Sequence, residues 1–212
     1  MDLDTLLNKN QKEAATYLDS HLRIIAGAGS GKTRVLTHRI AYLIDECGVN
    51  PWNIMAITFT NKAAGEMRER VDNLVGFGAE SIWVSTFHSS CVRILRLHIE
   101  NLGYTTSFSI YDSDDQKTLM RQVFKTLDID TKQFKERSVL AAISSAKDKL
   151  ITPEEFLLNA GGDFREKKTG EIYKEYQKQL KKNNALDFDD LIVKTVELFQ
   201  NNPQILDYYQ ER

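Results

Sequence analysis

A short glycine-rich segment, AGAGSGKT at residues 26–33, constrains the fold of this chain more than any other feature. Glycines let backbone N–H groups converge on phosphate oxygens without a Cβ in the way. A lysine after them reaches the β- and γ-phosphates, and a following Ser or Thr hydroxyl coordinates Mg²⁺. Alternate glycines, Lys32 and Thr33 supply these parts. The segment therefore predicts a nucleoside triphosphate site, with Thr33 holding the metal through its hydroxyl.

The segment departs from the usual phosphate-loop pattern at Ala26, where a glycine is expected. Its surroundings support the phosphate loop, because the apolar run 22–26 predicts a buried strand before it and a helical pattern begins at Lys32. The positive end of that helix dipole favours bound phosphate. We expect the whole loop to contact the nucleotide: Ala26, Gly27, Ala28, Gly29, Ser30, Gly31, Lys32 and Thr33.

Apolar runs alternate with helical patterns through the first half of the chain. This alternation is typical of a parallel sheet built from βαβ units, on which ligands sit at the carboxyl ends of the strands. A short helix capped by Asn8 comes first, at residues 8–19. The predicted strands are 22–26, 54–59, 81–85 and 108–112, and the predicted helices between them are 32–46, 61–75 and 88–101.

The character of the sequence changes at about Asp112. Residues 113–183 carry helical patterns with many Lys and Glu residues, and Thr152 followed by Pro153 predicts a helix start. We therefore interpret residues 112–184 as a small helical insertion in an α/β fold.

Two acidic groups invite comparison with metal sites, and both have simpler interpretations. Asp45 and Glu46 lie on the helix that leaves the phosphate loop, whereas a Mg²⁺ carboxylate should follow a strand beside the loop. We interpret this pair as surface charges. For Asp187, Asp189 and Asp190, helix capping by Asp187 is a simpler explanation than a metal site.

Composition limits the partners and the compartment. The 212 residues include 28 Lys and Arg against 30 Asp and Glu, so nucleic acid would have to bind through local basic patches. Cys47 and Cys91 have no metal-ligand spacing and are expected to be reduced core thiols. The chain has no apolar run long enough to span a membrane and does not begin like a secretion signal. We expect a cytoplasmic protein.

Five sequence blocks together resemble the superfamily 1 helicases of the UvrD/Rep/PcrA type. The resemblance covers the whole chain, with the blocks in the family's order and spacing. It implies a RecA-like P-loop NTPase motor subdomain, 1A, at residues 1–111 and 185–212, interrupted by a helical subdomain, 1B, at residues 112–184. The blocks are LNKNQKEAA at 7–15, AGAGSGKT at 26–33, ITFTNKAAGEMRERV at 57–71, VSTFHSSCVRILR at 84–96 and LDFDDLI at 186–192.

The resemblance also implies roles for residues around the nucleotide, which would be ATP with Mg²⁺. Gln11 matches the glutamine that reads adenine, and an amide can pair with adenine N6 and N7. Without the resemblance, a solvated helix residue would be the simpler interpretation of Gln11. Arg34 matches a position near the nucleotide, although a charged surface residue is a comparable interpretation. Lys32 and Thr33 would be the catalytic residues.

Further positions match contacts to single-stranded DNA. Phe59 and His88 occupy such positions, and an aromatic ring at a strand end can stack on any base. The alternatives are a core residue for Phe59 and a helix-capping histidine for His88. Asn61 and Thr86 could donate to phosphates. The Lys-rich stretch 165–182 could touch duplex DNA, as 1B does in the family, or form a solvated helix face among its glutamates.

The function implied is an ATP-dependent helicase and translocase that moves 3′ to 5′ on single-stranded and partly duplex DNA in repair or replication. The family's Walker B strand, with its Asp-Glu pair, is expected just after Arg212. The 212 residues alone are therefore expected to be monomeric and to bind nucleotide without turnover. The alternatives are the motor of a helicase–nuclease, a nucleotide- or DNA-binding module without catalysis, and an unrelated P-loop kinase. A kinase would leave the blocks at 57–71 and 84–96 without explanation.

Overall fold

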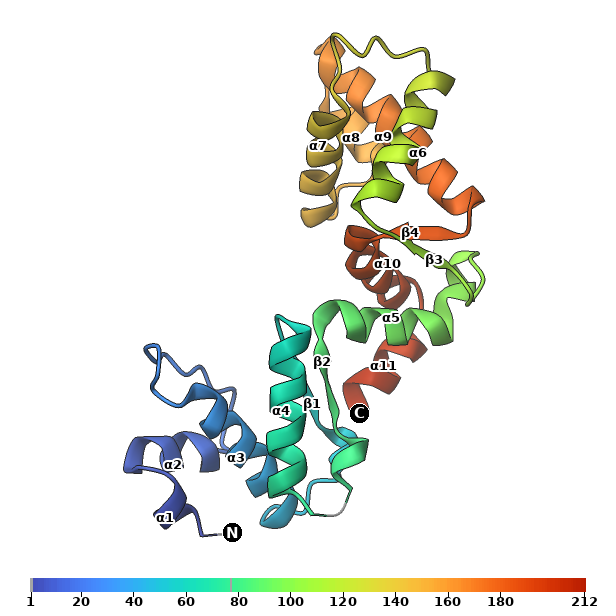
Figure 1. Cartoon of the computed structure of the whole chain (residues 1–212). Coiled ribbons are helices and arrows are strands. Elements are labelled where there is room, and N and C mark those ends of the chain that lie inside the picture. Colours follow the sequence, from blue (N-terminus) through green and yellow to red (C-terminus); the bar gives the residue numbers. More distant parts are fainter. Residues whose placement is uncertain (1, 77) are drawn as a thin grey trace. The chain divides into compact units, whose positions relative to one another are not determined.

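The computed structural model describes residues 2–76 and 78–212, which group into two compact units. The first unit comprises Met1–Phe87 and Tyr208–Arg212, and the second comprises His88–Asp207. Figure 1 labels their elements along the chain. The predicted subdomain boundaries at 112 and 184 differ from these limits, and the 1A and 1B division stays a prediction of the resemblance.

The first unit has a mixed helix–strand fold. Strands β1 and β2 pair in parallel, with Thr58 opposite Thr86 at their carboxyl ends. The elements are α1 (Leu3–Leu6), α2 (Lys9–Thr16), α3 (Lys32–Asp45), η1 (Pro51–Asn53), β1 (Met55–Thr58), α4 (Asn61–Leu74), η2 (Ala79–Ser81) and β2 (Trp83–Thr86).

Helices α3 and α4 pack with this small sheet to form the core of the first unit (Figure 1). The apolar residues of α4 recur at helical spacing, so that Met67 and Val71 face the same side and are buried. Thr60 caps α4, because its hydroxyl accepts a hydrogen bond from the Ala63 N–H. The core residues are Ile40, Ala41, Ile54, Ala56, Met67, Val71, Val75, Ala79 and Ile82.

The segment 22–26, predicted as the first strand, is not a strand in the structure. It has no regular secondary structure and joins neither of the two-stranded sheets that the described residues form. Ile25 is accordingly 86% exposed. An apolar run favours a strand only where a neighbouring strand supplies hydrogen bonds, and no described strand does so here. The predicted continuous sheet is therefore wrong for the described residues, and the RecA-like arrangement stays a prediction.

The second unit is mainly helical, and a short parallel pair joins Ser109 of β3 to Ala185 of β4. Helix α5 begins at Phe87, the last residue of the first unit's main segment, and α11 runs from the second unit into the first unit's final residues. The elements are α5 (Phe87–His98), η3 (Ile99–Leu102), β3 (Ser109–Tyr111), α6 (Ser113–Thr126), α7 (Glu136–Asp148), α8 (Pro153–Asn159), α9 (Phe164–Lys182), β4 (Ala185–Asp187), α10 (Phe188–Asn201) and α11 (Pro203–Glu211).

Helices α6, α7 and α9 enclose the core of the second unit, which contains Met120, Ile143 and Tyr176. The predicted helix start at Thr152 is confirmed, because Thr152 and Glu155 form a capping box and Pro153 is the first helical residue. The predicted helical character of 113–183 is also confirmed. None of the helices formed by residues 2–76 and 78–212 is long and apolar enough to cross a membrane.

Candidate functional site

The glycine-rich segment forms a tight loop in front of α3. Gly29 and Gly31 have φ angles of 74° and 83°, in the left-handed region that glycine adopts without strain. The Ser30 hydroxyl donates to the Gly27 carbonyl at 2.7 Å and closes the turn. Gly31 precedes α3 without a side-chain cap, so the N–H groups of the first turn keep their donor capacity. This geometry suits an anion at the start of α3.

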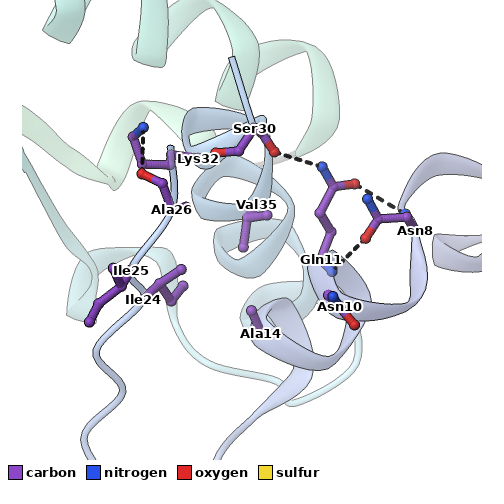
Figure 2. A pocket seen from close by; sticks show the side chains of 10 residues that line it. All are labelled: Asn8, Asn10, Gln11, Ala14, Ile24, Ile25, Ala26, Ser30, Lys32 and Val35. Atoms are coloured by element: carbon purple, nitrogen blue, oxygen red, sulfur yellow. Dashed lines mark hydrogen bonds between the residues drawn. The ribbon is translucent and has the colours of Figure 1, made fainter. Parts of the chain in front are cut away.

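Lys32 reaches back over the loop. Its Nζ donates to the carbonyl oxygen of Ala26 at 3.1 Å, as Figure 2 shows. It also donates to the carbonyl oxygen of Gly27 at 2.6 Å. Both acceptors are neutral, whereas a phosphate oxygen is charged and forms a stronger bond with an ammonium. Lys32 is therefore placed where it can exchange two carbonyl contacts for a phosphate contact.

Gln11 connects α2 to the loop through both ends of its side-chain amide. Its Nε2 donates to the Ser30 carbonyl at 3.0 Å, and its Oε1 accepts from the Asn8 N–H at 3.1 Å (Figure 2). The Asn8 side chain in turn accepts from the Gln11 N–H, which completes a capping box and confirms the predicted cap at Asn8. The structure thus brings Gln11 to the loop, although neither contact tests adenine recognition.

A pocket of about 260 Å³ lies between α2, the loop and α3, as Figure 2 shows. Its lining combines apolar and polar residues, as small-molecule sites commonly do. Its lining residues are Asn8, Asn10, Gln11, Ala14, Ile24, Ile25, Ala26, Ser30, Lys32 and Val35.

Thr33 and Arg34 line other pockets. A pocket of about 330 Å³ is lined by Thr33 and shares Ile24 and Lys32 with the first one, so the two pockets adjoin. Arg34 lines a third pocket, with His38 and Arg70 among its other residues. Of the predicted nucleotide contacts outside the loop, the structure therefore brings Gln11, but not Arg34, into the first pocket.

The described residues fit a nucleotide phosphate better than they fit a complete Mg²⁺ site. The loop and Lys32 supply donors, and Thr33 supplies one hydroxyl. Within residues 2–76 and 78–212, no group of three or more His, Cys, Asp or Glu residues could hold a metal ion. Asp45 ends α3 and Glu46 follows it at the surface, as predicted. A further Mg²⁺ carboxylate would have to come from elsewhere.

The carboxyl ends of β1 and β2 carry a second set of candidate residues. Phe59 follows β1 and is 93% exposed, which excludes the core alternative for this residue. Asn61 is exposed at the start of α4, whereas Thr86 is only 7% exposed at the end of β2. Phe87 follows β2 and lies 6.2 Å from Phe59, measured between ring centroids.

Phe87 was missed by sequence reasoning. The signal available was positional: Phe59 ends the predicted strand 54–59, and Phe87 lies two residues beyond the predicted strand 81–85. Predicting their contact would have required the register of the two strands.

His88 belongs to the second unit, where it is half-buried. Its ring centroid lies 5.7 Å from that of Phe188, the first residue of α10. Its predicted contact with DNA stays a prediction.

The acidic cluster at the start of α10 is a capping motif with a buried partner. Asp187 caps α10 and forms a capping box with Asp190, which confirms the sequence interpretation. Lys147 Nζ lies 2.7 Å from an Asp187 oxygen and 2.9 Å from an Asp190 oxygen, and all three side chains are buried. Burial, followed by repulsion from Asp190, raises the pKa of Asp187.

Lys147 was also missed, although the sequence held a signal. It falls on the helical stripe of Val139, Ile143 and Ala146, whose residues are buried in α7. A lysine on an apolar stripe is buried only when it is paired, so an acidic partner could have been sought.

The remaining predictions concern cysteines and the Lys-rich helix. Cys47 is exposed, so the expectation of a core thiol is wrong for it, because it lies beyond the end of α3. Cys91 is half-buried, and burial raises the pKa of its thiol. Along α9, Lys168 and Lys178 pair with Glu171 and Glu175 three residues away. These pairs support the solvated-face interpretation.

Comparison with known proteins gives a consistent result. The family model described as UvrD/REP helicase N-terminal domain matches residues 7–212. The ATP-dependent DNA helicase PcrA of Bacillus subtilis (strain 168) is 53% identical over 206 residues. The proteins of that name from Staphylococcus epidermidis (strain ATCC 12228 / FDA PCI 1200) and Staphylococcus aureus (strain NCTC 8325 / PS 47) are 52% identical over 206 residues. Each alignment covers 97% of this chain and 28% of the relative.

Proposed function

This chain belongs to the UvrD/REP helicase family, and on that premise we propose that the protein is an ATP-dependent DNA helicase that translocates 3′ to 5′ on single-stranded DNA. Because the chain spans 28% of the length of the PcrA relatives, the activity proposed is that of the full-length protein. The observation that carries the proposal is the phosphate loop, on which Lys32 and Gln11 converge from α3 and α2.

In the proposed nucleotide site, the loop 26–33 and the first turn of α3 bind the phosphates of ATP. Lys32 leaves the carbonyls of Ala26 and Gly27 and neutralises charge on the transferred phosphoryl group. Gln11 turns from Ser30 to the adenine edge, and Arg34 lies near the nucleotide. The Thr33 hydroxyl would be one ligand of Mg²⁺, which would neutralise negative charge on the phosphates when bound.

We place the single-stranded DNA at the carboxyl ends of β1 and β2. Phe59 stacks on a base there, while Asn61 and Thr86 donate to the phosphate backbone. His88 provides a further contact. Junctions between single and double strands engage the 1B subdomain at 112–184, which interrupts the motor subdomain at 1–111 and 185–212 in the sequence. The protein acts in repair or replication in the cytoplasm, as a monomer in the form of these 212 residues.

The full-length protein and the 212 residues alone should differ in their ability to hydrolyse ATP. Phosphoryl transfer needs carboxylates that hold the metal and orient water, and the described residues place no acidic cluster at the loop. We expect both polypeptides to bind ATP, but only the full-length protein to show ATPase activity stimulated by single-stranded DNA.

The matching variant is Lys32→Ala. It should lower the DNA-stimulated kcat of the full-length protein by at least about 100-fold, because it removes a charge that acts on the transferred phosphoryl group. Lys125→Ala, which removes an exposed lysine on α6, is the control and should leave kcat unchanged. Robust ATPase activity in Lys32→Ala would contradict the proposed site.

A further inference from the structure

A pocket of about 400 Å³ lies between α3 and α4 of the first unit, and we call it the α3–α4 pocket. Its volume is within the range of small-molecule sites. None of its lining residues lines either of the two pockets at the phosphate loop, so it is separate from the proposed nucleotide site. The lining residues are Arg34, Thr37, His38, Arg70, Asn73 and Leu74.

The lining of the α3–α4 pocket carries cationic side chains without an acidic one. Within residues 2–76 and 78–212, the Arg34 guanidinium forms no ion pair. Arg70 lies 3.8 Å from Glu66, and both of these side chains are about half exposed. An ion pair of this kind at the surface contributes little, so Arg70 can exchange it for a stronger partner. Both guanidinium groups are therefore able to bind an anion.

His38 adds a ring that is nearly buried and has one nitrogen available to the pocket. The residue is 6% exposed, and its Nδ1 lies 2.7 Å from the Arg34 carbonyl oxygen. Because a carbonyl oxygen only accepts, Nδ1 carries a proton and donates it. Nε2 has no hydrogen-bond partner in the part of the chain that the structure describes. This nitrogen accepts from a ligand hydroxyl when the ring is neutral and donates to an oxyanion when the ring is protonated.

The chemistry of these donors favours phosphate. A guanidinium group presents its N–H groups as a planar fork that matches two phosphate oxygens, and such charge-assisted bonds are strong. A tetrahedral phosphate has enough oxygens to contact both arginines and His38 at once, whereas a carboxylate has two. The pocket is also larger than a single phosphate requires, and it offers the Asn73 amide and the apolar Leu74 side chain to a further part of the ligand.

We propose that the α3–α4 pocket binds a phosphorylated small molecule. Arg34, His38 and Arg70 contact its phosphate group, while Asn73 and Leu74 contact its organic part. The inference goes beyond the proposed function and does not rest on it. The backbone of Arg34 adjoins the phosphate loop, whereas its side chain lines the α3–α4 pocket.

The test measures binding of inorganic phosphate to the full-length protein by the broadening of its ³¹P NMR signal. Saturating Mg²⁺ and AMP-PNP, an ATP analogue that is not hydrolysed, first occupy the phosphate loop, and wild type should still bind phosphate. Arg70→Gln should weaken this binding about tenfold, because it removes a charged donor. Arg70→Lys keeps the charge but loses the fork, and it should weaken binding only about threefold.

Glu66→Gln is the matched control, because it breaks the same surface ion pair but keeps Arg70. It should not weaken phosphate binding. Equal binding by wild type and Arg70→Gln would overturn the inference, as would the loss of all phosphate binding once AMP-PNP occupies the loop. Displacement of phosphate by an equal concentration of acetate would assign the pocket to carboxylates and would also overturn it. None of these results bears on ATP hydrolysis or unwinding, so the proposed function stands or fails separately.

Discussion

At the scale of single residues, the buried ion group of the second unit makes the strongest prediction about stability. Lys147 is 2% exposed between the carboxylates of Asp187 and Asp190, and the Tyr176 hydroxyl donates to Asp187 at 3.1 Å. Removing the lysine leaves two acidic side chains buried without a cation. Lys147→Met should lower the free energy of unfolding by about 3–5 kcal/mol.

Chemical denaturation of this variant gives the measurement. The control is Lys149→Met, which changes an exposed lysine two residues away and should have an effect below about 0.5 kcal/mol. Equal stability of the two variants would show that the buried contacts contribute little.

The buried group of Lys147, Asp187 and Asp190 also predicts that the free energy of unfolding depends on pH. Burial opposes the charge on Lys147, but attraction by Asp190 and Asp187 outweighs it and raises the pKa of Lys147 above its ordinary value of 10.5. The resulting stability is complete below pH 10.5 and is lost as pH rises through the folded-state pKa. The difference in unfolding free energy between wild type and Lys147→Met should therefore stay constant below pH 10.5 and narrow as the pH rises above that value.

Gln11 makes the sharpest prediction about nucleotide selection, because its amide is both a helix cap and a loop contact. Gln11→Glu keeps an oxygen for the Asn8 N–H but removes the amide N–H, whereas Gln11→Ala removes both. Wild type should bind ATP about tenfold more tightly than GTP, and both variants should lose this preference.

Thermal unfolding distinguishes the two roles of Gln11. Only Gln11→Ala should destabilise α2, by about 1 kcal/mol. Retention of the ATP preference in Gln11→Glu would assign adenine recognition to another residue.

At the scale of elements, the local sequence specified helix ends well and strands less well. Asn8, Thr152 and Asp187 were predicted as caps and cap helices in the structure, because capping depends on residues within one turn. The segment 22–26 was predicted as a strand and forms none, because a strand depends on a partner that its own sequence does not specify. The contact between Phe59 and Phe87 was inaccessible for the same reason.

Two glycines inside helices have opposite surroundings and give a matched test of packing. A Cβ on Gly170 of α9 would lie 2.6 Å from Leu157 Cδ2 and 2.8 Å from Leu157 Cγ of α8, so the Leu157 side chain would have to shift. A Cβ on Gly65 of α4 would meet no atom within 4 Å. Gly170→Ala should cost about 1–3 kcal/mol despite its gain in helix propensity.

Gly65→Ala should instead stabilise the protein by about 0.5–1 kcal/mol, because it gains helix propensity without a clash. Thermal unfolding of both variants provides the comparison. If Gly170→Ala were the more stable of the two, the close packing of α8 on α9 would be wrong.

At the scale of the whole molecule, the family could be identified from sequence motifs, whereas the two compact units could be identified only from the structure. The sequence contains complete motifs for the glycines of the phosphate loop and for Gln11, and in the structure Gln11 contacts that loop. The division at Phe87 and His88 does not coincide with the change of sequence character at Asp112, because α5 and β3 belong to the second unit. Composition changes along the chain, whereas compactness depends on contacts between distant segments.

Strand separation by the full-length protein tests the central claim most directly. Fluorescence would follow the unwinding of a short duplex that carries either a 3′ or a 5′ single-stranded tail, with ATP and Mg²⁺ present. The account predicts rapid unwinding of the 3′-tailed duplex, little unwinding of the 5′-tailed one, and none by Lys32→Ala. Two results would contradict the proposed helicase function. One is unwinding by the Lys32→Ala variant, and the other is a wild-type protein that binds ATP and single-stranded DNA but separates neither duplex.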